Sequence, residues 1–129
     1  MYAGGMLSKQ HRFHGHGSLN YLFRNGQSAR GAFLQVRYVY NKRRSDSRVA
    51  VIVGKKVAKS AVVRNRIRRR VFEVVRRHMD SIAPHTDMAL TVFSAELAVL
   101  PASEVERAVQ TCLQRARLYR TEIVSGIVE

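Results

Sequence analysis

The segment from Arg64 to Arg77 constrains the fold more than any other part of this chain. Its fourteen residues contain seven arginines and a single acid, Glu73. Apolar positions recur at helical spacing and predict a helix over about 61–79 with one stripe that can pack on a sheet. That stripe comprises Val63, Ile67, Val71, Val74 and His78. The arginines cover most of the remaining helix surface: Arg64, Arg66, Arg68, Arg69, Arg70, Arg76 and Arg77.

The whole chain shows the same imbalance of charge. Twenty-three Lys and Arg face nine Asp and Glu, which gives a formal net charge of +14. Like charges three or four residues apart destabilise a helix by roughly 0.2–0.5 kcal/mol per pair, and a face that is merely solvated usually mixes both signs. We therefore expect a polyanionic partner, and the excess of arginine favours forked contacts with phosphate oxygens.

A nucleic acid fits this charge better than a membrane. No apolar run approaches the ~18 residues of a spanning helix, residues 1–17 lack the apolar segment of a signal peptide, and no lipidation pattern is evident. The single cysteine, Cys112, cannot form an internal disulfide, which is typical of a reducing compartment. We expect a cytoplasmic protein without a membrane partner.

The remaining pattern predicts one α+β domain at residues 18–120, with a flexible Gly- and His-rich arm at 1–17 and a tail at 121–129. Ser18 and Gly26 are expected to bracket a short helix with an apolar face formed by Leu19, Leu22 and Phe23.

Strands are expected at 33–40, 48–53 and 89–93, and the pattern leaves open whether two or three strands precede the helix at 61–79. The strand at 48–53 is apolar enough for a central strand covered on both sides. In the strand at 33–40 neither set of alternating side chains is purely polar. The pattern therefore leaves open whether the buried set contains Phe33, Gln35, Arg37 and Val39, or Leu34, Val36, Tyr38 and Tyr40.

A last helix is predicted by apolar spacing that places Cys112 on its buried face, as a small hydrophobe. Ser103 and Glu106 have the spacing of a capping box at its start.

A resemblance to a known family lies at the start of the arginine segment. It consists of Lys55-Lys56 and then the run Ala61-Val62-Val63-Arg64-Asn65-Arg66-Ile67-Arg68-Arg69. This arrangement closely resembles the signature of the bacterial ribonuclease P protein component, and it is specific because the Lys pair precedes the Arg-Asn-Arg core at this distance. The resemblance covers about residues 7–120 and includes Lys9, Arg12, Phe13, Phe23 and Gly26.

The resemblance implies a fold and a division of labour. The expected fold is a two-layer α+β sandwich with a four-stranded sheet and a left-handed βαβ crossover. A large RNA would carry out Mg²⁺-dependent hydrolysis of precursor tRNA and hold the metal. The protein would bind that catalytic RNA and the single-stranded 5′ leader of the precursor, with no catalytic residue, no metal site of its own and no obligate protein partner.

The same resemblance assigns two sets of residues by position. The RNA-binding set is Arg12, Lys55, Lys56, Arg64, Asn65, Arg66, Arg68 and Arg69. The leader-binding cleft is lined by Phe13, Leu19, Phe23, Val36 and Tyr38, of which Val36 and Tyr38 depend on the register of the strand. The chain departs from the family at Leu19, where an aromatic is more frequent, and at Ala58, where a larger apolar residue is frequent. It also departs at Phe72, which replaces a basic residue on the side expected to lie opposite the apolar stripe.

Other functions are less well supported by the residues. His11, His14 and His16 lie in the arm without a nearby Cys or carboxylate, so a zinc site is not expected, and His78 is expected to be a hydrogen-bonded core histidine. The acids are too few and scattered for a two-metal nuclease. A structural RNA-binding protein, such as a ribosomal component, is the alternative that shares the charge. A DNA-reading helix would need more base-reading side chains than Asn65.

Overall fold

The structure is a computed structural model that describes residues 17–40, 47–82 and 85–118. In chain order its elements are α2 (Gly17–Asn25), β1 (Gln27–Arg30), β2 (Leu34–Tyr40), β3 (Arg48–Val53), α3 (Ala61–His78), the 3₁₀ turn η2 (Met79–Ser81), β4 (Thr86–Val92), the 3₁₀ turn η3 (Ala95–Ala98) and α4 (Ala102–Arg115). None of the described helices is both long and apolar enough to cross a bilayer.

The four strands form one sheet in the order β1-β2-β4-β3. β2 is antiparallel to both β1 and β4, whereas β3 is parallel to β4. The parallel pair is joined through α3, so β3-α3-β4 is the crossover to which the family expectation refers; its left hand stays a prediction. Because β3 is an edge strand, the expectation that 48–53 is a central strand was wrong.

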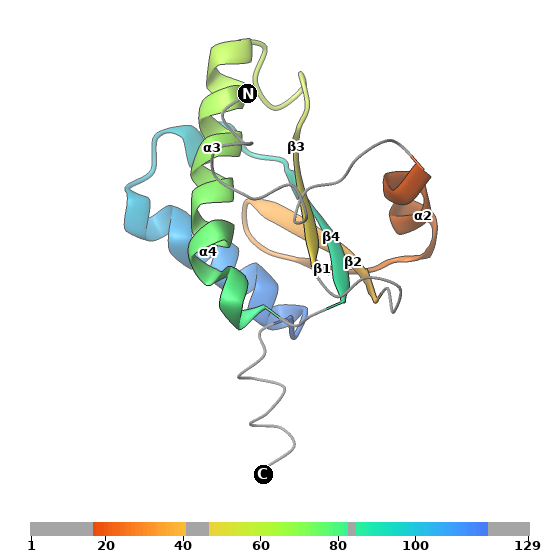
Figure 1. Cartoon of the computed structure of the whole chain (residues 1–129). Coiled ribbons are helices and arrows are strands. Elements are labelled where there is room, and N and C mark those ends of the chain that lie inside the picture. The colour runs from red at the N-terminus through yellow and green to blue at the C-terminus, as the bar shows by residue number, and fades with distance from the viewer. Residues whose placement is uncertain (1–16, 41–46, 83–84, 119–129) are drawn as a thin grey trace.

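The two faces of the sheet carry different helices (Figure 1). α3 packs against β3, and α4 packs against β1 and β2, while α2 contacts β2 and β4 from the opposite side. We call the sheet surface on the side of α2 the α2 face. The α+β class with a four-stranded sheet is thereby confirmed.

The main core lies between the sheet and the layer of α3 and α4. Leu34 and Val36 of β2 are fully buried in it beside Leu90 and Val92 of β4. Side chains alternate along a strand, so Gln35, Arg37 and Val39 project from the α2 face instead. The choice that the sequence left open is thus settled in favour of burying Leu34 and Val36.

The α3 helix buries a wider band than the sequence stripe predicted. Ile67, Val71 and Val74 are buried as expected, but Val75 and Phe72 are buried as well. The expectation that Phe72 lies opposite the apolar stripe was wrong, because the ring is only 6% exposed and belongs to the core. At the position where the resemblance implies a basic residue, this chain therefore has a core side chain, Phe72.

Two predicted helix caps were also wrong. α2 begins at Gly17, one residue before the expected cap Ser18. α4 begins after Pro101 and has no side-chain cap. Glu106 does not reach back to Ser103, because its carboxylate bonds the imidazole of His78 in α3 at 3.0 Å. Instead of capping its own helix, Glu106 joins α4 to α3.

Candidate nucleic-acid interface

The start of α3 is fixed by a capped turn at the end of the connection that follows β3, residues 54–60. The Ser60 hydroxyl accepts a hydrogen bond from the Val63 N–H at 3.3 Å, which satisfies one of the free donors of the first turn. Arg64 Nη1 donates to the carbonyls of Ala58 and Lys59, both at 2.9 Å. These bonds hold the connection against the helix that it precedes. Lys55 and Lys56, on the same connection, are thereby kept near the positive N-terminus of α3.

Five of the eight predicted RNA-binding residues are exposed along this connection and the first turns of α3. We call them the basic ridge: Lys55, Lys56, Asn65, Arg66 and Arg69. Lys55, Lys56 and Arg66 have no hydrogen-bond or ion-pair partner among the residues that the structure describes. Their charges are therefore available to an external anion.

The other predicted RNA-binding residues are placed differently. Arg64 and Arg68 are half-buried at the side of the helix, and Arg68 donates through Nη2 to Oδ1 of Asn65. Arg64 uses Nη1 internally, and since a guanidinium carries five N–H donors, others are left for a phosphate. Arg12 lies outside the described residues. RNA binding by this set stays a prediction.

Arg70 belongs to the packing of the fold. Its guanidinium donates to the carbonyl oxygens of Leu97, at 2.8 Å, and Leu100. It thereby satisfies carbonyls at the end of η3 and just beyond it. The sequence alone counted Arg70 with the exposed arginines, because nothing local signals a contact with residues 27 and 30 positions away.

Glu73 and Glu106 pair with arginines at the far end of α3. Glu73 bonds Arg76 and lies 3.7 Å from Arg77, and Arg77 also pairs with Glu106 at 3.2 Å. The hydrogen bond from Arg76 lowers the pKa of Glu73. The hydrogen bond with His78, followed by the charge of Arg77, lowers the pKa of Glu106. The positive potential of the helix is thus concentrated at its N-terminal half.

The lowered pKa of Glu106 predicts a pH dependence of stability. A carboxylate with a lowered pKa in the folded state stabilises the fold above its unfolded pKa of about 4.3 and loses that contribution as the pH falls through the folded value. Glu106→Gln should therefore be less stable than the wild type at pH 7, with the difference shrinking below about pH 4.3. Urea unfolding between pH 7 and pH 3 measures this. Glu104→Gln, at an exposed acid in the same helix, is the matched control, and a pH-independent deficit for Glu106→Gln would contradict the assignment.

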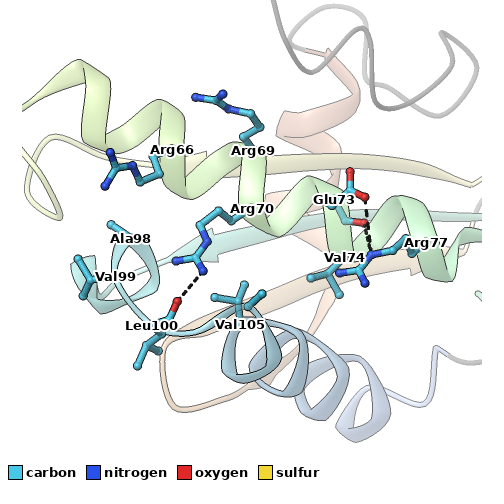
Figure 2. Close-up of a pocket in the computed structure, with 11 residues that line it drawn as sticks. Arg66, Arg69, Arg70, Glu73, Val74, Arg77, Ala98, Val99, Leu100 and Val105 are labelled. Atoms are coloured by element: carbon cyan, nitrogen blue, oxygen red, sulfur yellow. Dashed lines mark hydrogen bonds and ion pairs between the residues drawn. The ribbon is translucent and has the colours of Figure 1, made fainter.

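A groove of about 890 Å³ runs beside the basic ridge, between α3 and the connection from η3 to α4 (Figure 2). Arg70 reaches from α3 to the Leu100 carbonyl, and Arg66 and Arg69 also line the groove from α3. The opposite wall is apolar and includes Val99, which is 77% exposed. The groove therefore combines a basic wall with an apolar one, a combination that accommodates phosphate and base together.

The predicted leader cleft is only partly assembled. On α2, Leu19 is half-buried and Phe23 is exposed. Val36, in contrast, is 0% exposed and faces the layer of α3 and α4, so its assignment to the cleft was wrong. Tyr38 lies two positions after Val36 on β2 and so projects from the same face of the sheet. It lines a separate groove of about 570 Å³ near the end of α4. Phe13 lies outside the described residues.

The strand residue that accompanies Phe23 is Arg37. Its Nη1 donates to the Phe23 carbonyl at 3.2 Å, and its guanidinium carbon lies 5.9 Å from the centre of the Phe23 ring. Sequence reasoning missed Arg37 because the register of β2 was open. A one-residue shift in strand register exchanges every side chain between faces.

The remaining predicted side chains have internal roles. His78 bonds Glu106 and lies 3.3 Å from the Gln110 amide, which confirms a hydrogen-bonded histidine. Cys112 is fully buried, and burial raises the pKa of its thiol. His11, His14 and His16 lie outside the described residues, and within the described ranges no three His, Cys, Asp or Glu side chains gather as metal ligands.

Comparison with known proteins places this geometry in a family. Residues 7–117 match the family described as Ribonuclease P. The chain belongs to the ribonuclease P protein family. Among its relatives, the ribonuclease P protein component of Roseiflexus castenholzii is 42% identical over 93 residues, which cover 72% of this chain and 75% of that protein. The component from a Synechococcus strain is 31% identical over 116 residues, covering 88% and 86%.

The ribonuclease P protein fold is also matched by solved structures. The Staphylococcus aureus RNase P protein superimposes with a TM-score of 0.76 at 20% identity and covers 84% of this chain and 97% of its own. At that identity the likeness concerns the fold alone. The family match extends through the basic ridge, α2 and α4, so both surfaces described above lie within it.

Proposed function

We propose that this chain is the protein subunit of ribonuclease P, that it binds the catalytic RNA through the basic ridge, and that it binds the 5′ leader of precursor tRNA on the α2 face. The observation that carries the proposal is the family match, together with a capped α3 that bears Arg66 and is preceded by Lys55 and Lys56. All three side chains are exposed and have no partner among the described residues.

The physical support comes from the distribution of charge. In the part of the chain that the structure describes, Glu73 and Glu106 pair with arginines of the second half of α3. An incoming phosphate backbone can therefore meet Lys55, Lys56 and Arg66, which have no partner among those residues, beside the positive helix N-terminus. If six to eight cations each neutralise a phosphate, affinity should fall roughly 10³-fold or more between 50 and 200 mM salt.

The chemistry is assigned to the RNA. Among the described residues, no group of side chains is arranged to hold a metal ion. We therefore infer that Mg²⁺ is held by phosphates of the catalytic RNA, and that the protein contributes affinity for substrate and neutralises backbone charge around the metal site. This division of roles makes the protein essential for efficient 5′ maturation of tRNA without a catalytic residue of its own.

The leader is assigned to the α2 face because stacking there does not depend on sequence. Phe23 is exposed and is paired with Arg37. Stacking of a base on an aromatic ring contributes about 1–3 kcal/mol and tolerates any base. That property suits a leader whose sequence differs between precursors.

Reconstitution tests the proposal. The purified chain alone should leave precursor tRNA intact, and adding it to the cognate catalytic RNA should lower the concentrations of Mg²⁺ and of substrate needed for cleavage. Unchanged processing in its presence would contradict the proposal. Recovery of the chain with ribosomal subunits, instead of with one catalytic RNA, would support the structural RNA-binding alternative.

A further inference from the structure

A second arginine–aromatic pair lies on the α2 face, away from α2 itself. The guanidinium carbon of Arg30 lies 4.2 Å from the centre of the Phe93 ring. β2 separates β1, which carries Arg30, from β4, which Phe93 follows. The Arg30 side chain therefore reaches across the sheet surface. Both residues stay exposed, and Phe93 keeps 37% of its surface accessible.

The backbone fixes this pair on the same face as Phe23 and Arg37. Arg30 pairs with Gln35, which shares its face with Arg37. The Phe93 N–H donates to the Phe33 carbonyl at 3.0 Å and so continues the ladder between β2 and β4 by one more residue. Gln35, the partner of Arg30, and Arg37 are two positions apart on β2, which places the backbones of Arg30 and Arg37 roughly 7 Å apart along the strand.

The Arg30–Phe93 pair also lies in a positive environment. Arg115, at the end of α4, donates to the Arg30 carbonyl at 2.8 Å and brings a second guanidinium to the last residue of β1. The one acid of the sheet on this face, Asp87, is buried and paired with Arg48. Charge complementarity on this face therefore favours an anionic polymer.

We propose that the Arg30–Phe93 pair is a second stacking site for single-stranded RNA, and that one leader contacts the Phe23–Arg37 pair and the Arg30–Phe93 pair together. Unstacked bases bind on aromatic rings and on guanidinium planes alike, and the cation of Arg30 lies where a neighbouring phosphate would pass. The inference rests on the proposed function and adds a second site, so that a longer segment of the leader contacts the protein.

The test measures binding of precursor tRNAs with leaders of increasing length to the holoenzyme, reconstituted with full-length chain, under conditions that block cleavage. Wild-type affinity should rise with leader length and level off once the leader reaches Arg30–Phe93. With Phe93→Leu the rise should stop at a shorter leader, and the longest leaders should bind about 5- to 150-fold more weakly. Binding of the shortest leaders should not change. The salt dependence should also stay the same, because the ring carries no charge.

Tyr40→Leu is the matched control, since it removes an exposed aromatic from β2 that projects from the opposite face. It should reproduce the wild-type length dependence, and the thermal unfolding of both variants should be compared. Equal weakening of all leaders by Phe93→Leu, or none, would overturn the second site while leaving the proposed function intact. A loss confined to binding of the catalytic RNA would also overturn it. A wild-type enzyme without any dependence on leader length would instead overturn the leader-binding part of the proposed function and the second site with it.

Discussion

Replacing Lys55, Lys56 and Arg66 together by Gln should lower the affinity of the chain for the catalytic RNA by about 10²- to 10³-fold at 0.1 M salt, since each lost phosphate contact removes roughly one released counterion. All three side chains are exposed and lack partners among the described residues. Their removal should therefore cost binding without costing stability. Titration of labelled catalytic RNA, together with thermal unfolding of the free variant, measures both quantities.

The contrasting variant for this experiment is Arg70→Gln. Arg70 donates to the Leu97 and Leu100 carbonyls, so its loss should lower the melting temperature of the free protein. The affinity for the catalytic RNA, measured at a temperature where the variant is folded, should change little. A triple variant that binds RNA as tightly as the wild type would mean that the basic ridge faces solvent in the complex.

The second large effect is expected at the ion pair of Arg48 and Asp87. Nε and Nη2 of Arg48 donate to the two carboxylate oxygens at 2.9 and 2.7 Å, and the side chains are 9% and 6% exposed. Asp87→Leu would leave a buried guanidinium without its carboxylate, and we expect a loss of about 3–5 kcal/mol in the free energy of unfolding. Urea denaturation at pH 7 measures this loss.

A double-mutant cycle separates the pair from its surroundings. Replacing both partners, as Arg48→Met with Asp87→Leu, removes the buried charge altogether and should recover most of the stability lost in either single variant. If the double variant is as unstable as the sum of the two singles, the stabilisation comes from other contacts of these residues. The ion pair joins β3 to β4, so the result also reports on the parallel edge of the sheet.

The features predicted correctly from sequence are those set by local periodicity. Ile67, Val71 and Val74 recur at helical spacing and are buried, and Cys112 lies on the buried face of α4 for the same reason. The exposure of Arg66 followed from the same helical wheel. In these cases a periodic pattern is sufficient to predict which residues are buried, because each helix packs on the core through one side.

The errors concern contacts between distant segments. Phe72 is buried because the core around α3 is wider than one stripe, and Val36 because the register of β2 turns it away from α2. β1, with the short polar sequence Gln-Ser-Ala-Arg, had no strand pattern of its own and forms by pairing with β2. Glu106 leaves its expected cap for His78, 28 residues away. None of these choices is encoded in a short window of sequence.

The same reasoning explains why the candidate site was predicted unevenly. The basic ridge is a property of one helix and the turn before it, so residue identity and spacing were enough to locate it. The α2 face is assembled from α2, β1, β2 and the end of β4. Arg37 and the Arg30–Phe93 pair therefore became visible only once the sheet register was known.

The catalytic RNA is expected to bind the basic ridge at the start of α3 specifically, and not the excess positive charge of the chain as such. The most direct test compares the salt dependence of RNA affinity for two triple variants with the same net charge. One carries Gln at Lys55, Lys56 and Arg66. The other carries Gln at Arg24, Arg107 and Arg117, which are exposed in α2, in α4 and just after α4.

The slope of log affinity against log salt should become shallower by about 2–3 for the ridge variant, at roughly 0.7–0.9 for each lost phosphate contact. It should change little for the control variant, whose cations lie on other surfaces. Equal changes of slope in the two variants would contradict the account, because the RNA would then respond to total charge without recognising this helix.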